Sequence, residues 1–231
     1  MCGRYAGPPQ EPILHLFSVE AVTGFAPPSG NIAPTQTVNI VIDARQPGST
    51  GPDSLADAPF TRELRTARWG LVPSWAPAID PRRLLINARS ETVTVKPSFR
   101  AAATSRRAIV PATGYYEWAL EGSKKVPYFL HPPDDSILGF AGLYEWWRVP
   151  EGTDLTRVPA AQDGWLCSMT IITRSATDAL GHIHDRMPVV VPPDMVNDWL
   201  SPLLTKRAEV DDLLGAMPDP VLTPTQKAPA H

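Results

Sequence analysis

The sequence has only two cysteines and no long apolar run. Cys2 and Cys167 are too few to form a four-cysteine zinc site. No apolar run approaches the roughly 18 residues that cross a bilayer, and the residues after Met1 lack the apolar stretch of a signal peptide. We therefore expect a cytoplasmic protein with no membrane partner, in which both thiols stay reduced.

The sequence is also poor in stretches suited to long helices. Its 27 prolines predict many turns and short strands. Hydrophobic residues make up 43% and charged residues 19%, which allows a sizeable core and excludes global disorder. We find no internal repeat and no clean linker. We expect one compact, β-rich α+β domain over residues 1–215, with barrel-like mixed sheets, peripheral short helices, a surface loop at 46–59 and a Pro-rich C-terminal tail at 216–231.

Local patterns place the expected elements along the chain. β-branched or alternating runs predict strands at 37–42, 62–69, 106–110, 114–119, 126–131, 137–144, 165–173 and 187–191. Helical patterns occur at 11–18, 194–200 and 206–214. A turn-rich loop is expected after Pro150, and the tail from Pro218 onward is expected to fray.

Basic residues are scarce overall but unevenly distributed. The net charge is −3, yet ten basic residues and only three acids lie between Arg62 and Arg107, so that this segment carries +7. A local basic surface binds phosphates whatever the sign of the whole chain. Trp69 and Trp75 lie in the same segment, and aromatic side chains stack on the bases of single strands. A solvated basic face would explain the composition equally well.

Cys2 is the sharpest candidate for chemistry. A small residue at position 2 permits removal of Met1, which would leave Cys2 with a free α-amine beside its thiol. Both groups titrate within about two pH units of neutrality. Such a 1,2-aminothiol condenses with an aldehyde to a Schiff base and then closes a thiazolidine ring, which an internal cysteine cannot do. A cysteine at position 2 can also be accidental.

Two further polar residues stand in apolar surroundings. Asn87 follows the apolar run 84–86 and could form part of a site wall, although Asn87 and Ser90 would also serve as caps of a turn or helix. Glu117 lies in an aromatic strand, where alternation places it on the same face as Tyr115. Desolvation there would raise the pKa of the carboxyl towards the range useful for acid–base catalysis. An edge strand with Glu117 facing water is the alternative.

His182 and His184 are separated by one residue, but no third or fourth metal ligand stands near them in the sequence. Zinc is therefore not the leading interpretation. His184 precedes Asp185 and Arg186, which favours a proton carrier or oxyanion partner held in an ionic network. A structural histidine in a turn is the alternative.

Taken in order, six segments of the chain closely resemble the SOS-response-associated peptidase family, whose members shield abasic sites. The resemblance covers roughly residues 2–200 and is specific as a combination, although each segment alone would be weak. The segments are Met1-Cys2-Gly3-Arg4-Tyr5, Asn31-Ile32-Ala33-Pro34-Thr35, Arg68-Trp69-Gly70-Leu71-Val72-Pro73-Ser74-Trp75, Ile86-Asn87-Ala88-Arg89-Ser90-Glu91-Thr92, Gly114-Tyr115-Tyr116-Glu117-Trp118 and His184-Asp185-Arg186-Met187-Pro188.

The resemblance implies a positively charged cleft that binds single-stranded DNA containing abasic sites. It implies that autoproteolysis removes Met1 and that Cys2 then forms a stable thiazolidine cross-link with the ring-opened abasic sugar. It also implies a lyase side activity. It also implies a monomer without cofactor or metal, associated with the nucleoid if the source is bacterial. The residues matched to catalysis are Cys2, Asn87, Glu117 and His184, and those matched to DNA binding are Arg4, Trp69, Trp75 and Arg89.

Two other functions use the same residues differently. In an N-terminal-nucleophile amidohydrolase or peptidase, Cys2 would attack an amide with its own amine as the base, and no basic cleft would be needed. In a non-catalytic single-strand-binding module, the Arg and Trp side chains would bind DNA and Cys2 would be incidental. The loop at 46–59 and the segment 150–164 look longer than the minimal family pattern, which puts DNA-length preference in question more than the chemistry.

Overall fold

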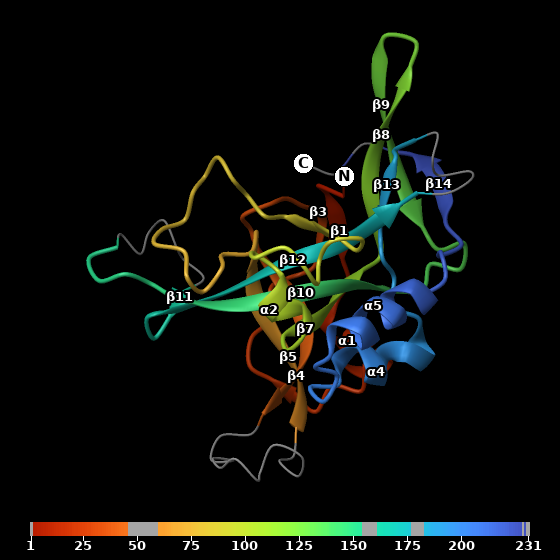
Figure 1. The fold of residues 1–231 in the computed structure, drawn as a ribbon. Helices are drawn as coiled ribbons and strands as arrows, with labels where there is room; N and C mark the ends of the chain where they lie inside the picture. The colour runs from red at the N-terminus through yellow and green to blue at the C-terminus, as the bar shows by residue number, and fades with distance from the viewer. Residues whose placement is uncertain (1, 46–59, 154–160, 177–182, 228, 230–231) are drawn as a thin grey trace.

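A small closed β-barrel forms the centre of the computed structural model, which describes residues 2–45, 60–153, 161–176, 183–227 and 229 (Figure 1). Its strands follow the order β12-β10-β7-β4-β5, and β5 returns to β12 through a short parallel pairing. All other neighbours in the barrel are antiparallel. The strands are β4 (Thr37–Arg45), β5 (Phe60–Trp69), β7 (Arg107–Ala112), β10 (Leu138–Arg148) and β12 (Trp165–Ser175). The expected β-rich α+β fold with a barrel is confirmed.

Alternation along each barrel strand separates an inner core from an outer one. Val38 and Ile40 of β4 pack with Met169 of β12 inside the barrel. The next residue, Val41, packs outward with Ile109 of β7 and the helices. This period of two follows from the pleat, which sends successive side chains to opposite faces of a strand. The barrel therefore has no empty lumen, and any site must lie at its ends or on its outside.

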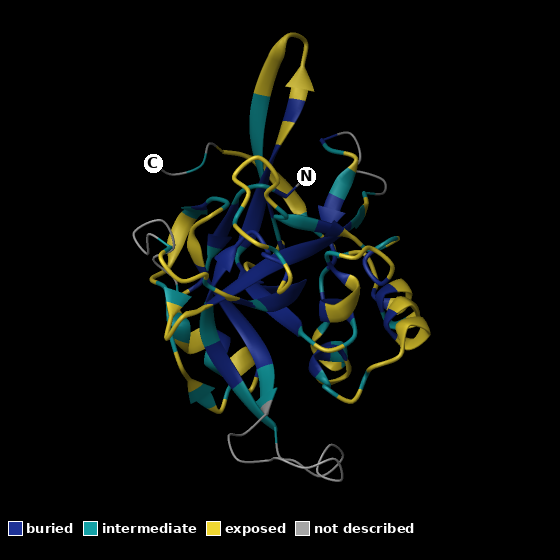
Figure 2. Ribbon diagram, turned by 60° about the vertical axis from the view of Figure 1, so that its left-hand side comes forward, coloured by how far each residue is buried: buried dark blue, intermediate teal, exposed yellow. Residues whose placement is uncertain are grey.

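A second, five-stranded sheet covers one end of the barrel. Its order is β14-β9-β8-β1-β3, and Tyr5 and Tyr115 belong to the same core as the barrel interior. The Tyr5 ring makes edge contacts with Trp69 at 5.2 Å and with Phe140 at 6.1 Å between centroids. The strands are β1 (Tyr5–Gly7), β3 (Ser29–Ile32), β8 (Gly114–Glu121), β9 (Lys124–His131) and β14 (Thr223–Gln226). The β8–β9 hairpin projects beyond the body, and its outer part is largely exposed (Figure 2).

Short helices and strands cover the outside of the barrel. Arg107 is buried and donates to Trp199 O at 2.7 Å, to Ala103 O at 2.8 Å and to Ser201 O, so it binds the C-terminal carbonyls of two helices. These elements are α1 (Gln10–Leu16), α2 (Arg100–Ala103), η3 (Pro193–Met195), α4 (Val196–Leu200), α5 (Arg207–Ala216), β2 (Ala21–Val22), β6 (Asn87–Arg89), β11 (Ala161–Gln162) and β13 (Arg186–Pro188).

Most predicted elements are found within a few residues of their expected bounds, with three differences. The C-terminal tail does not fray at Thr223–Gln226, because β14 pairs with the edge of β9. The strand expected at 187–191 is shorter and spans Arg186–Pro188. The turn-rich region includes β11, joined to β12 by a tight Asp163-Gly164 turn in which both residues have positive φ. The loop predicted at 46–59 lies outside the described residues.

No helix in the described part of the chain is long and apolar enough to cross a membrane. Within the same ranges, no three His, Cys, Asp or Glu side chains gather where they could hold a metal ion. His182, one of the two histidines considered above, lies outside the described residues.

Candidate active site

Cys2 is fully buried at the end of the barrel that the second sheet covers. The Asn87 side chain donates from Nδ2 to the Cys2 carbonyl oxygen at 3.0 Å. Asn87 begins β6, which pairs in parallel with residues 171–173 near the end of β12, so a barrel strand sets the position of the amide. The Asn87 side chain therefore holds Cys2 and does not cap a turn or helix. Cys2 and Asn87, which were predicted from separate motifs 85 residues apart, thus meet in the structure.

Glu117 lies on β8 beside the same thiol. Only 4% of Glu117 is exposed, and burial raises the pKa of its carboxyl from the ordinary 4.5 to about 7. Burial also raises the pKa of the Cys2 thiol, and the negative charge of Glu117 raises it further, which places the two groups in electrostatic contact. The expectation of a desolvated carboxyl is confirmed, and Glu117 does not face water. A carboxyl with a pKa of about 7 exchanges protons readily at neutral pH.

His184 and Glu117 line one small cavity together with Tyr115 and Arg186. The backbone N–H of Arg186 donates to His184 Nδ1 at 3.0 Å, so the neutral ring carries its proton on Nε2. Nδ1 also lies 2.8 Å from Asp185 Oδ1, to which it can donate only when Nδ1 itself carries a proton. Burial lowers the pKa of His184, which favours the neutral ring.

An ion pair fixes the segment that carries His184. Arg186 donates from Nη1 and Nη2 to the two carboxylate oxygens of Glu91 at 2.6 and 3.0 Å. This fork-to-fork contact lowers the pKa of Glu91 to about 2. It ties β13 to the segment that follows β6, so the segments that carry His184 and Asn87 are held together. The ionic network predicted around His184 is therefore present, with Glu91 as the anion of the pair.

The four residues matched to DNA binding occupy different environments. Arg89 is exposed, and Arg4 is half-buried with Nη1 donating to Asn31 Oδ1 at 3.0 Å. Trp75 is 65% exposed, so its ring is available for stacking. Trp69 is fully buried, and its indole Nε1 donates to Ile86 O at 3.0 Å. The Trp69 ring is thus enclosed in the barrel core against Tyr5, and this structure offers no exposed face of it for stacking on a base.

The basic segment does not form one phosphate-binding face. Arg62, Arg65 and Arg106 pair with Asp43, Glu63 and Glu145, respectively. Arg68 and Arg107 are buried. The exposed cations of the segment are Arg82, Arg83, Arg89, Lys96 and Arg100. The composition does not distinguish these ten basic side chains, but in the structure five of them are paired with carboxylates or buried.

Sequence reasoning did not single out Tyr5 and Tyr115, whose rings enclose the Cys2 end of the core. The two residues face each other in the β1–β8 ladder. Burial raises the pKa of both phenols, and Cys2 raises each further, so both lie close to the thiol. Both belong to the motifs quoted above, but no sequence signal separates them from ordinary core aromatics.

Comparison with known proteins places these motifs in a family. Residues 1–227 match the profile of SRAP, the SOS response associated peptidase family. The chain is 34% identical over 218 residues to the abasic site processing protein YoqW of Bacillus subtilis, covering 93% of this chain and 86% of that protein. It is 32% identical to the abasic site processing protein HMCES of Xenopus tropicalis, over 60% of this chain and 45% of that protein.

A solved structure supports the same assignment. The crystal structure of a protein from Bordetella bronchiseptica is 25% identical, with a TM-score of 0.70, and the match covers 98% of this chain and all of that one. The family match reaches residue 227 and so includes β14, which completes the sheet beside Cys2. The chain belongs to the SOS response associated peptidase family.

Proposed function

We propose that this protein senses abasic sites in single-stranded DNA and shields them by a covalent thiazolidine cross-link through Cys2. Relatives that match most of the chain are named abasic site processing proteins. The observation that carries the proposal is the convergence of Cys2, Asn87, Glu117 and His184 at one end of the barrel. These residues come from four distant segments, and together they provide a nucleophile, an orienting amide and two groups that exchange protons.

The reaction begins with the removal of Met1, which the family's peptidase activity would supply. Removal leaves Cys2 as a terminal residue with a free α-amine. In the described residues, Asn87 Oδ1 is buried and has no hydrogen-bond partner. An amine at Cys2 would offer a donor to this oxygen while Asn87 Nδ2 holds the Cys2 carbonyl. Because Cys2 is fully buried in the unprocessed chain, removal of Met1 would also open a path to it.

The chemistry proceeds in two steps with the loss of one water molecule. The Cys2 amine attacks C1′ of the ring-opened sugar to form a carbinolamine, which loses water to form an imine. The thiol sulfur then bonds to the imine carbon, its proton passes to the imine nitrogen, and a thiazolidine closes. Holding amine, thiol and aldehyde together lowers the entropic cost of both steps. Ring closure competes with β-elimination from the same imine, which would cut the strand.

Glu117 and His184 would carry the protons. The Glu117 carboxyl, whose pKa is about 7, can protonate the departing hydroxyl of the carbinolamine and then accept a proton from the thiol. The imidazolium form of His184 can give its Nε2 proton to the sugar O4′ as the ring opens, and the neutral ring can hold O4′ by a hydrogen bond from Nε2–H. Arg89 and Arg4 would hold phosphates beside the abasic site, and Trp75 would stack on a base. We expect the protein to be a monomer. We expect it to act in the compartment that contains the DNA.

The test is a denaturing gel of the Met-processed protein mixed with a single-stranded oligonucleotide that carries one abasic site. We expect a heat-resistant adduct that maps to Cys2 by mass spectrometry and is absent when the base is intact. An adduct that forms equally on undamaged DNA would contradict the proposal. No adduct from a protein with a confirmed free Cys2 terminus would also contradict it, and amide turnover without DNA would then indicate an N-terminal-nucleophile hydrolase.

A further inference from the structure

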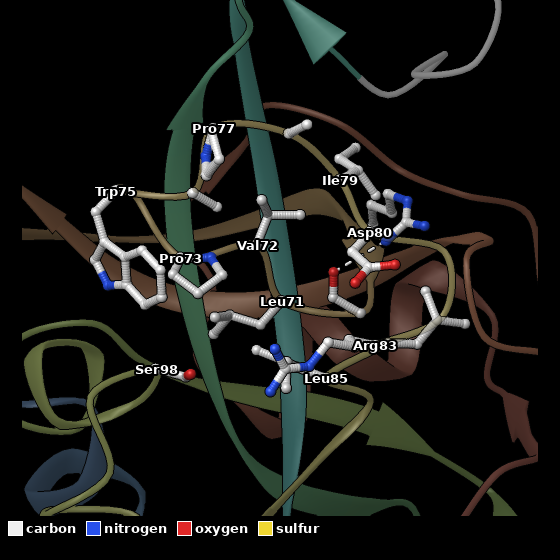
Figure 3. A pocket seen from close by; sticks show the side chains of 15 residues that line it. Leu71, Val72, Pro73, Trp75, Pro77, Ile79, Asp80, Arg83, Leu85 and Ser98 are labelled. Atoms are coloured by element: carbon white, nitrogen blue, oxygen red, sulfur yellow. Dashed lines mark hydrogen bonds between the residues drawn. The ribbon is translucent and has the colours of Figure 1, made fainter.

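A cavity of about 420 Å³ lies under the segment that joins β5 to β6. This volume falls within the range of small-molecule sites and accommodates one nucleobase. Figure 3 shows the Trp75 ring at one side, Asp80 and Arg83 at the other, and Leu71 and Val72 between them. The cavity therefore has an apolar floor, with the charged side chains of Asp80 and Arg83 in its wall.

Arg68 is a buried cation in the wall of this cavity. It is only 8% exposed, and Nη1 donates to Gly70 O at 3.0 Å. Within the described ranges, no carboxylate lies within ion-pair distance of Arg68, whereas Arg62, Arg65 and Arg106 each have one. A guanidinium has five N–H donors, and the backbone carbonyl of Gly70 accepts from only one nitrogen of Arg68, Nη1. The cavity therefore offers donors that a ligand with acceptor atoms could use.

The charges around the cavity disfavour a phosphate as the occupant. Asp80 lies in the wall, and its Oδ1 accepts from the Arg82 backbone N–H at 2.9 Å. A carboxylate would repel a phosphate, whereas it accepts hydrogen bonds from the ring N–H and amine groups of a base. The exposed ring of Trp75 provides a stacking face beside the apolar floor. A flat heterocycle with both acceptors and donors satisfies all these groups.

The cavity is next to the Cys2 end of the barrel. Leu71 and Leu85 form a bridge at its floor, and Leu85 lies two residues before Asn87, which holds the Cys2 carbonyl. Two residues of extended chain span about 7 Å. A strand bound with its abasic sugar at Cys2 would therefore bring a nearby base to this cavity.

We propose that the cavity binds a guanine base close to the abasic site, stacked on Trp75, with O6 and N7 accepting hydrogen bonds from Arg68 and the N1–H and 2-amino groups donating to Asp80. The proposal rests on the proposed function and adds sequence preference to it. Guanine presents two acceptors on one edge for an arginine, whereas adenine places an amine beside its N7. The cavity thus favours guanine among the four bases.

The experiment uses the unaltered protein and alters the base. Oligonucleotides carry guanine, adenine, cytosine or thymine at each of the two positions on either side of the abasic site, and single-turnover cross-linking rates are compared. We expect guanine at one position to raise the rate about tenfold over the other bases. Replacing that guanine by 7-deazaguanine, which lacks N7, or by hypoxanthine, which lacks the 2-amino group, should remove most of this gain. The same analogues at a distant position are the controls.

Affinity for oligonucleotides with a tetrahydrofuran abasic analogue, which cannot cross-link, gives a second measurement. Arg68→Lys should lose the guanine preference in both measurements while binding other sequences as before, and Trp75→Ala should weaken binding of every flanking base. Equal rates and affinities for all bases and for 7-deazaguanine would overturn this proposal and leave the proposed function intact. A guanine preference in the binding measurement without any cross-linking would support the cavity assignment and count against the covalent function.

Discussion

Cys2 and Cys167 are both buried in the core inside the barrel, yet only Cys2 lies beside the residues of the proposed reaction. Cys167 pairs with Trp146 near the start of β12, whereas β6 and Asn87 meet β12 at residues 171–173, near its other end. Burial raises the pKa of both thiols, in the case of Cys167 to about 12. Burial therefore does not distinguish them, and neither does the residue type.

The neighbours and the position in the chain make the difference. Cys167 is an internal residue, so its nitrogen belongs to a peptide bond and cannot form an imine. Near it lie Arg65 and Glu63, which pair with each other at 2.7 Å. Near Cys2 lie Asn87 and Glu117, the latter with a pKa of about 7. If the proposed function holds, the difference between the two cysteines lies in the chain terminus and the neighbouring carboxyl, and not in the thiol itself.

Replacing each cysteine by alanine in turn should give the largest difference between the two sites. Cys2→Ala should lose the heat-stable cross-link entirely, because no sulfur remains to close the ring, while its α-amine can still form an imine and cut the strand. Cys167→Ala should cross-link at a rate close to that of the unaltered protein. Denaturing gels of both variants on one abasic oligonucleotide provide the measurement. Stable cross-linking by Cys2→Ala would contradict the thiazolidine mechanism.

Removing the carboxyl beside Cys2 should have the next largest effect. We expect Glu117→Gln to slow single-turnover cross-linking about 100-fold, the lower range for general acid–base catalysis. The rate of the unaltered protein should change with an ionisation near pH 7, and this ionisation should be missing in Glu117→Gln. The matched variant Glu121→Gln alters an exposed carboxyl on the same strand and should leave both rate and pH profile unchanged.

The raised pKa of Glu117 also makes the free energy of unfolding depend on pH. Because the pKa of about 7 lies above the ordinary 4.5, its favourable contribution is complete below about pH 4.5 and is lost as pH rises through 7. Glu117→Gln should therefore be more stable than the unaltered protein at pH 8, by up to about 3 kcal/mol, and show little gain at pH 5. Denaturant unfolding at the two pH values measures the difference, and equal gains at both would show that burial of the charge is not the cause.

The orienting amide should matter less than the groups that react. Asn87→Ala removes the hydrogen bond to the Cys2 carbonyl, and we expect about a tenfold loss in cross-linking rate with a loss of about 1 kcal/mol in stability. Thermal melting checks that the variant folds. A cross-linking rate equal to that of the unaltered protein would show that the second sheet alone orients Cys2.

The turns near the two cysteines also differ in whether their residues tolerate a positive φ. We expect a substitution at one of these turns to have the smallest effect. Near Cys167, the β11–β12 turn uses Asp163 and Gly164, residues that tolerate positive φ. Near Cys2, Thr35 is exposed, has a φ of 75° and donates to Trp69 O at 2.8 Å. A β-branched residue is strained there. Thr35→Gly should stabilise the protein by about 1 kcal/mol and raise the Tm by about 3 °C, and Thr35→Ala by less. A lower Tm for Thr35→Gly would contradict this account.

Local patterns determined the main strands and helices of this protein, because alternation and helical spacing are properties of neighbouring residues. Motif likeness also predicts Cys2, Asn87 and Glu117 as site residues, and the structure places the three close together. By contrast, the pairing of β14 with β9 depends on an unpaired strand edge that lies more than 90 residues earlier, and Pro-rich local sequence gives no sign of it.

Only the tertiary structure determines which residues of the same type are buried, paired or exposed. Trp69 and Trp75 share one motif, but barrel closure buries the first and leaves the second exposed. The arginines between 62 and 107 look alike in sequence, but Arg65 pairs with Glu63, Arg107 binds helix ends and Arg68 lines a cavity. The sequence determines which side chains are present and how each strand alternates. Which of them meet depends on strand order and barrel closure, since burial and electrostatic environment are set by residues far apart in the chain.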